Sequence, residues 1–261
     1  MEERTVIAGF DLGNEYSQIC YFDDNKCMPV CIGKNEDEMF IPTVLGLKDT
    51  GEWLCGRDAL AFHEAGRCSL INDFILALEN DTPVYVDEKE IMPELLLVTF
   101  FKKTLFKLKE YEPNRSIKKI VVTVERLSER LAEYIYLALE AMGIGRTRVV
   151  VLSYKQCYLH YVLSHSSELW VNDVGMFDFG YRGLKYYQIT VDRQRTPYIV
   201  GITERDYSES MNMSMLNTQK DKDSLCYIFE NIVQNAVHRQ ILSALYMTGD
   251  GFLGGWADSS M

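Results

Sequence analysis

The same four-residue pattern occurs twice in this chain, each time between two β-rich segments. Phe10-Asp11-Leu12-Gly13 is followed after a short turn by SQICYF, and Phe177-Asp178-Phe179-Gly180 is followed by LKYYQI. β-Branched and aromatic residues on both sides of a glycine turn predict a β-hairpin. Repetition of such a unit along a chain indicates internal duplication. We therefore expect two related lobes, each with one Asp-x-Gly hairpin.

A β-α-β unit is predicted between the two hairpins. Residues 116–124 have the composition of a strand, 125–145 that of a helix, and 146–153 that of a second strand. A helical crossover joins parallel strands, and this alternation is typical of an α/β fold. Before this unit, 93–111 has apolar residues at helical spacing, which predicts a long amphipathic helix. Packing on a core is its expected role, with attachment to a membrane surface as the alternative.

The C-terminal part of the chain is predicted to contain a helix and a glycine-rich turn. A polar stretch, 203–223, follows the second hairpin, and a helix over 224–245 is expected to begin at Asp223 or Ser224 as its N-cap. Glycines at 249, 251, 254 and 255 indicate a strand-to-turn transition where the backbone approaches another group closely.

The polar stretch also contains four large side chains, which form a candidate docking surface for a protein partner. They are Tyr207, Met211, Met213 and Met215. Packing of these side chains onto the lobe is the alternative.

The composition limits the classes of function. The formal net charge is −11 and leaves no basic stripe that could follow a phosphate backbone, so we expect no nucleic-acid binding. The chain does not open with a basic segment and an apolar run, and it has no stretch of about 18 apolar residues, so we expect a cytoplasmic protein without membrane insertion. The seven cysteines include no Cys-x-x-Cys pair, which indicates reduced thiols instead of disulfides or a zinc site.

Taken in order, the hairpin, the β-α-β unit, the second hairpin and the helix with its glycine turn resemble a known nucleotide-binding fold. Actin, hexokinase and the DnaK-type heat-shock chaperones share this fold, and the chain is most similar to the chaperones. The resemblance covers most of the chain and implies an α/β protein of two ribonuclease H-like lobes, the actin-like ATPase fold. It implies a first lobe over 1–170, with an insertion subdomain at about 34–111, and a shortened second lobe over 171–261.

The resemblance also implies a site for ATP or ADP with Mg²⁺. Asp11 and Asp178 stand where the family has its catalytic aspartates, which hold the metal and its waters. The turn amides of the two hairpins would cradle the phosphates, and the last glycine turn would lie under the adenosine. The residues on matching cofactor-binding positions are Gly13, Asn14, Glu15, Tyr16, Gly180, Tyr181, Arg182, Gly249, Asp250 and Gly251.

Several family residues are replaced in this sequence. Asn14 and Glu15 stand in place of small hydroxyl residues, and a carboxylate beside a triphosphate is repulsive. Tyr181 and Arg182 replace glycines that would let the backbone approach phosphate. Leu60 falls where the chaperones have their catalytic lysine. We therefore expect weak binding of ATP or ADP with little or no hydrolysis, so at most a weak ATPase.

Two classes of function stay open. The first is an adenine-nucleotide-binding relative of the DnaK-type ATPases. The second is a non-catalytic pseudo-ATPase that keeps the fold as a protein-interaction scaffold. In the second class Asp11 and Asp178 have only structural roles, because an aspartate beside a turn commonly bonds nearby backbone amides.

Overall fold

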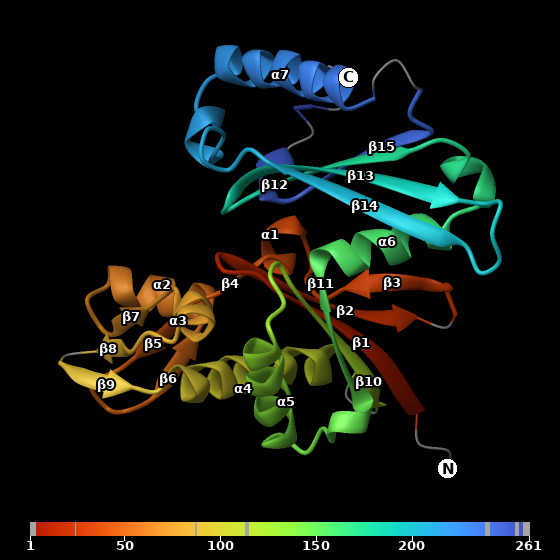
Figure 1. Ribbon diagram of the computed structural model, residues 1–261. Coiled ribbons are helices and arrows are strands. Elements are labelled where there is room, and N and C mark those ends of the chain that lie inside the picture. The colour runs from red at the N-terminus through yellow and green to blue at the C-terminus, as the bar shows by residue number, and fades with distance from the viewer. Residues whose placement is uncertain are drawn as a thin grey trace. The chain divides into compact units, whose positions relative to one another are not determined.

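Figure 1 shows the computed structural model of the chain, which describes residues 4–23, 25–86, 88–112, 115–237, 241–253 and 256–257. Contacts divide the chain into a first unit, Met1–Tyr154, and a second unit, Lys155–Met261, and each is described by itself. Gly254 and Gly255 of the predicted glycine turn lie outside the described residues. The protein combines helices with several sheets and is α/β, as predicted.

The first unit is built around a mixed sheet. Its main strands are β1 (Arg4–Leu12), β2 (Tyr16–Asp23), β3 (Met28–Cys31), β10 (Arg115–Val124) and β11 (Val149–Ser153), in the order β11-β10-β1-β2-β3. β1 pairs antiparallel with β2, and β2 pairs antiparallel with β3, which confirms the first predicted hairpin. β10 is parallel to β1, and β11 is parallel to β10, which confirms the predicted parallel pair of the β-α-β unit.

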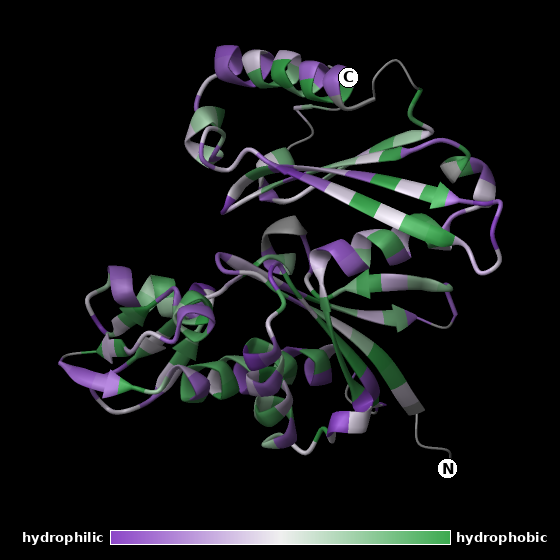
Figure 2. Ribbon diagram, viewed as in Figure 1, coloured by the Kyte–Doolittle hydropathy of each residue, from purple (hydrophilic) through white to green (hydrophobic). Residues whose placement is uncertain are grey.

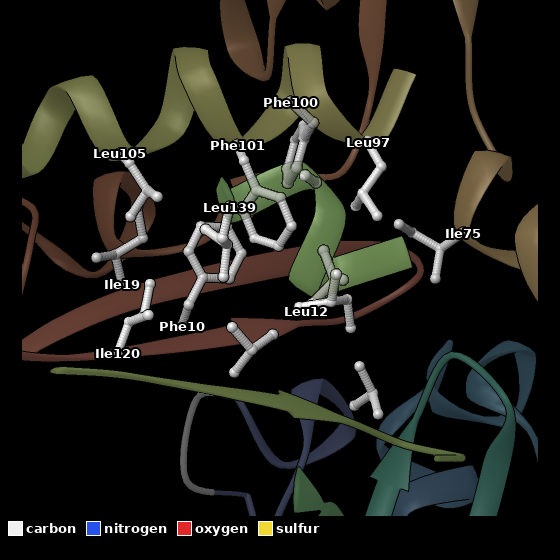
Figure 3. Packing of buried hydrophobic residues seen from close by; sticks show 14 of the residues in the cluster. Phe10, Leu12, Ile19, Ile75, Leu97, Phe100, Phe101, Leu105, Ile120 and Leu139 are labelled. Carbon is white, nitrogen blue, oxygen red and sulfur yellow. The ribbon is translucent and has the colours of Figure 1, made fainter. Parts of the chain in front are cut away.

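Two helices, α4 (Pro93–Tyr111) and α5 (Glu129–Glu140), pack on the core of the first unit. Side chains alternate along a strand, so every second residue of β1 points to this core. Figure 3 shows Phe10 of β1 directed toward α4, and its ring centroid lies 4.9 Å from that of Phe101. The predicted amphipathic helix is confirmed, because α4 has the predicted bounds and buries one face in the core.

Short elements fill the segment between β3 and α4. The strands are β4 (Ile41–Pro42), β5 (Leu45–Leu47), β6 (Trp53–Cys55), β7 (Ser69–Ile71), β8 (Val84–Val86) and β9 (Lys89–Ile91). The helices are α1 (Glu36–Met39), α2 (Arg57–Glu64) and α3 (Phe74–Asn80). β5 pairs with β6 and β7 in a small sheet, whereas β8 and β9 form a hairpin. Farther along, the 3-10 turn η1 (Arg146–Arg148) leads into β11.

The second unit has its own mixed sheet. Its strands are β12 (Val174–Gly180), β13 (Gly183–Asp192), β14 (Ile199–Asp206) and β15 (Ala244–Thr248), in the order β14-β13-β12-β15. β12 and β13 form the second predicted hairpin, β14 is antiparallel to β13, and β15 is parallel to β12. The order and directions therefore repeat those of β3, β2, β1 and β10 in the first unit.

Helices cover both faces of this second sheet. Val162 of α6 (Tyr154–Ser164) packs with Val174 and Ile189, whereas Phe229 of α7 (Gln219–Val237) packs with Phe177. Val174 and Phe177 are three positions apart on β12, so they point to opposite faces. Figure 2 shows hydrophilic and hydrophobic positions alternating along α7, as expected of a helix with one buried face. Among the described residues, no helix has both the length and the apolarity needed to cross a membrane.

The polar stretch 203–223 is more ordered than the sequence suggested. β14 extends into it as far as Asp206, and the 3-10 turn η3 (Met213–Leu216) follows. The predicted N-cap of α7 is wrong, because the helix begins at Gln219 after Thr218. Thr218 and Asp221 bond each other's backbone amides at 3.1 and 3.2 Å, which is a capping box.

The end predicted for the last helix is also wrong. α7 ends at Val237 among the described residues, and residues 244–248 form β15. The four side chains of the candidate docking surface, Tyr207, Met211, Met213 and Met215, pack against the core around Phe177 and Phe229. This arrangement corresponds to the alternative interpretation, in which these side chains pack onto the lobe.

Candidate functional site

The first Asp-x-Gly turn connects β1 and β2. Strand pairing ends at Leu12 and Ser17, and the carbonyl oxygen of Glu15 accepts a hydrogen bond from the amide of Thr43 at 2.8 Å. A Cβ atom on Gly13 would lie 2.2 Å from the carbonyl oxygen of Tyr16. The turn itself therefore requires glycine at position 13, without any ligand.

Asp11 lies near the end of β1 and bonds to neighbouring side chains. Its Oδ1 accepts a hydrogen bond at 2.8 Å from the Oγ1 of Thr123, its register partner on β10. Burial raises the pKa of Asp11, while hydrogen bonds from the side chains of Thr123 and Tyr154 act in the opposite direction. Burial therefore disfavours the ionised form that binds a metal. The sequence analysis did not identify Thr123 or Tyr154 as neighbours of this carboxylate.

The other residues of the first turn differ in their surroundings. Glu15 is exposed, and the Tyr16 ring packs edge-on against Phe40 with centroids 6.3 Å apart. The Oδ1 atom of Asn14 is buried and has no hydrogen-bond partner among the described residues. A buried amide oxygen without a partner costs about 1–3 kcal/mol, so this atom is a candidate acceptor for a ligand donor.

The second hairpin has a tighter turn. Gly180 pairs with Gly183, so only Tyr181 and Arg182 lie between the strands. A Cβ atom on Gly180 would meet nothing within 4 Å. Gly183, by contrast, has φ +89°, and a Cβ atom there would lie 2.4 Å from the carbonyl oxygen of Met211. The glycine that this turn requires is therefore Gly183, which the sequence analysis did not single out.

Asp178 is buried on β12 beside a hydroxyl donor and opposite a lysine. The Tyr158 hydroxyl of α6 donates to the Oδ2 of Asp178 at 2.8 Å. Lys185 is the register partner of Asp178 on β13, so both side chains project from the same face, with Cβ atoms about 5 Å apart. Asp178 is 8% exposed and Lys185 is 4% exposed. Two residues of opposite formal charge thus occupy directly opposed positions on one buried face, an arrangement that lowers the cost of burying each.

Lys185 is the residue of this site that the sequence analysis missed. It occupies an inward position in the strand segment Gly183–Asp192, where its neighbours are apolar or aromatic. A buried lysine in such a strand requires an anionic partner. The aspartate directly across the hairpin was therefore the signal that could have identified it.

The glycine turn after β15 packs against β12. Gly249 has φ +98°, and a Cβ atom there would lie 2.4 Å from the carbonyl oxygen of Phe179. A Cβ atom on Gly251 would lie 2.6 Å from the Phe179 ring. Asp250 begins the 3-10 turn η4 (Asp250–Phe252), and Trp256 Nε1 donates to the Gly251 carbonyl oxygen at 2.8 Å. The predicted close approach is confirmed, and the group that makes it is Phe179.

The two aspartates lie in different units, Asp11 in the first and Asp178 in the second. Within the second unit, Asp178 and the turn at Gly249 are close, because Asp178 pairs with Thr248 in register. No group of three or more His, Cys, Asp or Glu side chains in the described part of the chain could hold a metal ion. The surroundings of Asp178 do not suit Mg²⁺, because Lys185 already places a positive charge opposite the carboxylate.

Comparison with known proteins gives a family without an assigned activity. The family model described as "Family of unknown function (DUF5716) C-terminal" matches residues 26–261. The matched range contains the second hairpin and the turn at Gly249, and it begins after the first hairpin. No curated protein matches the chain.

Proposed function

The chain belongs to the DUF5716 C-terminal family, whose function is unknown, and we propose a function for it from its own geometry. In this proposal the protein is a non-catalytic relative of the actin-like ATPases and acts as a protein-interaction scaffold. The relationship to the actin-like fold is supported by the repeated strand order. In both units an antiparallel run of three strands is extended by a parallel strand next to the first. In both, the aspartate lies at the end of the first strand of the unit, beside the hairpin turn.

The observation that carries the proposal is the burial of Asp178 between Tyr158 and Lys185. A magnesium-binding carboxylate has to present a free oxygen to the ion or to its waters. Here one oxygen of Asp178 accepts the Tyr158 hydroxyl, and a buried ammonium group lies across the hairpin. The side chain that would anchor Mg²⁺ in the second lobe thus has a structural role instead.

The glycine turn supports the same conclusion. The space beside Gly249 and Gly251, which the family resemblance assigns to adenosine, is filled on one side by Phe179. Leu60 has no polar group that could hold a phosphate or position water. The residues that hydrolysis needs are therefore replaced or engaged in internal contacts.

The scaffold function requires a surface for a partner, and we place it on β14. This strand lies at the edge of the second sheet, and among the described strands it pairs only with β13. At its start, Tyr198 is 52% exposed and Ile199 is 50% exposed. An open strand edge with exposed apolar side chains can bind an extended peptide as an additional strand.

Peptide display selected on the purified protein tests this function. We expect enriched extended peptides that protect β14 amides from hydrogen exchange and bind the Tyr198→Ser, Ile199→Ser double variant much more weakly. Substituting the exposed Tyr227 by Ser is the matched control, because this residue is 68% exposed on α7. Peptides that bind wild type and the double variant equally, or a selection without enrichment, would contradict the proposal.

Weak nucleotide binding is the second candidate, and two observations favour it. A Cβ atom on Gly180 would meet nothing within 4 Å, so this part of the second turn has free space. Asn14 Oδ1 lacks a partner among the described residues and could accept a hydrogen bond from a ligand.

An assay of phosphate release from ATP separates the two candidates from a true ATPase. We expect the wild-type protein to hydrolyse ATP no faster than the Asp178→Asn variant does. A wild-type turnover approaching the typical enzyme value of about 10 per second would contradict both candidate functions.

A further inference from the structure

A separate cavity lies in the first unit, and none of the residues of the first hairpin turn lines it. Its volume is about 700 Å³, which is within the usual range of about 300–1,000 Å³ for small-molecule sites. It is lined by Val6 of β1, by the C-terminal half of α4 with Glu112 just after it, by the first residues of β10, and by Met142–Ile144 and Arg148 after α5. In Figure 1 these segments meet near the labels of α5 and β10. The proposed scaffold function does not involve any of these residues.

The floor of the cavity is apolar. Val6, Leu105, Leu108 and Ile144 line it, and each of these side chains is less than one tenth exposed. Phe106 of α4 also lines the cavity but is 60% exposed. A phenyl ring that borders a cavity and remains exposed gains free energy when an apolar ligand covers it. The floor and this ring therefore favour an apolar chain or ring system as part of the ligand.

The rim of the cavity is cationic. Four of its lining residues are basic, and one is acidic. The basic residues are Lys102, Lys109, Arg115 and Arg148, and the acidic residue is Glu112. Glu112 is paired with Arg115 at 3.1 Å, so it offsets only that charge. Since the whole chain has a formal net charge of −11, this concentration of positive charge runs against the overall sign and favours a local anion.

The lysines and Arg148 reach the rim in different ways. Lys102, Phe106 and Lys109 are spaced four and three residues apart, so they share one face of α4. Arg148 donates to the carbonyl oxygens of Ile117 and Gly143, and among the described residues it has no carboxylate partner. A guanidinium group has five N–H donors, so donors remain for an anionic ligand. Arg148 is thus held in place while its charge stays uncompensated.

We propose that this cavity binds an amphipathic organic anion, with its alkyl chain on the apolar floor and its carboxylate at the rim between Arg148 and Lys109. The apolar floor distinguishes this ligand from a free inorganic anion. The cationic rim distinguishes it from a neutral lipid. Arg148 supplies a directional contact to the carboxylate, while Lys102 and Lys109 supply mobile positive charge.

Calorimetric titration with dodecanoate below its micelle concentration tests the proposal on the full chain. We expect saturable one-to-one binding, with affinity reduced at least about tenfold for dodecanol, which lacks the charge, and for acetate, which lacks the chain. Dodecyltrimethylammonium, with the same chain and the opposite charge, should bind at least as weakly. Equal binding of acetate or inorganic phosphate would indicate a simple anion site and overturn the proposal, as would equal binding of dodecanol.

Variants on α4 locate the site. We expect Lys102→Glu with Lys109→Glu to weaken dodecanoate binding about tenfold or more, whereas Lys103→Glu with Lys107→Glu, the same double charge reversal outside the lining of this cavity, should have little effect. Phe106→Ala should weaken binding severalfold, and Leu95→Ala, at a residue 53% exposed on the same helix, is its control. All these side chains are at least half exposed or on the helix surface, so folding should be preserved. Equal effects of a variant and its control, or no binding to wild type, would overturn the proposal.

Discussion

Lys185 lies directly opposite Asp178 across the second hairpin, and both side chains are almost completely buried. Replacing Lys185 by Met leaves a buried carboxylate without its opposing charge. We therefore expect the free energy of unfolding to fall by about 3 kcal/mol or more, as for other broken buried pairs. Urea denaturation measures this change.

The double variant Asp178→Asn, Lys185→Met supplies the control for this pair. It removes both charges, so its stability should return to within about 1 kcal/mol of wild type. If Asp178→Asn and Lys185→Met each lower the free energy of unfolding by less than about 1 kcal/mol, the two charges do not depend on each other.

The Tyr158 hydroxyl is the second group that holds Asp178. Tyr158→Phe removes this donor from a buried carboxylate, so we expect a loss of roughly 1–3 kcal/mol in unfolding free energy. Tyr161→Phe on the same helix is the matched control, since Tyr161 is 48% exposed. If the control loses as much stability as Tyr158→Phe, the bond to Asp178 is not the cause.

Asp11 gives a pH dependence with a defined sign. Burial raises its pKa in the folded state above the ordinary value of 3.8, so the folded state binds this proton more tightly than the unfolded state does. Stability from this group is therefore lost as the pH rises from about 3.8 through the raised folded pKa. Asp11→Asn keeps an oxygen for Thr123 and removes the charge, so it should stabilise the protein at pH 7 and have a smaller effect near pH 4.

Thermal melts of wild type and Asp11→Asn between pH 4 and pH 7 measure this dependence. Thr123→Val provides a comparison, because it deletes the donor and leaves the carboxylate. A loss of stability in Asp11→Asn that grows toward pH 7 would mean that the ionised form is favoured in the folded protein.

The glycines differ in the effect expected of alanine. Gly249→Ala places a Cβ atom against the Phe179 carbonyl at a positive φ, so we expect a loss of about 2 kcal/mol or more. Gly180→Ala meets free space and should change stability by less than about 0.5 kcal/mol. If the second hairpin turn bound phosphate, a nucleotide-binding assay would show the reverse order. Gly180→Ala would then lower the affinity for nucleotide more than Gly249→Ala does.

Much of the fold could be predicted because local signals agreed with tertiary packing. Alternating strands around Gly13 and Gly180 gave both hairpins, and helical spacing gave α4 with its bounds. The start of α7 was missed because its capping box, Thr218 with Asp221, lies within a stretch that appears only polar. A strand running into the turn at Gly249 was predicted, but its first residues, Ala244 and Leu245, were assigned to the helix, because short apolar runs do not distinguish a helix from a strand.

The site was harder to predict, because its properties depend on which side chains meet in space. The sequence located Asp178 and Gly249 but not their neighbours. Lys185 and Phe179 are central to what these residues do, since one stands opposite the carboxylate in register and the other fills the space beside the glycine. The contact of Gly249 with Phe179 joins distant parts of the chain, and the pairing of Lys185 with Asp178 follows only once the register of the hairpin is known.

We propose that the internal contacts of Asp178 prevent it from anchoring a magnesium nucleotide. Calorimetric titration of the wild-type protein with ATP and ADP, each with and without Mg²⁺, tests it most directly. We predict no magnesium-dependent heat of binding at millimolar nucleotide, and the same result for Asp178→Asn. A dissociation constant in the micromolar range that requires Mg²⁺ and is lost in Asp178→Asn would contradict the account.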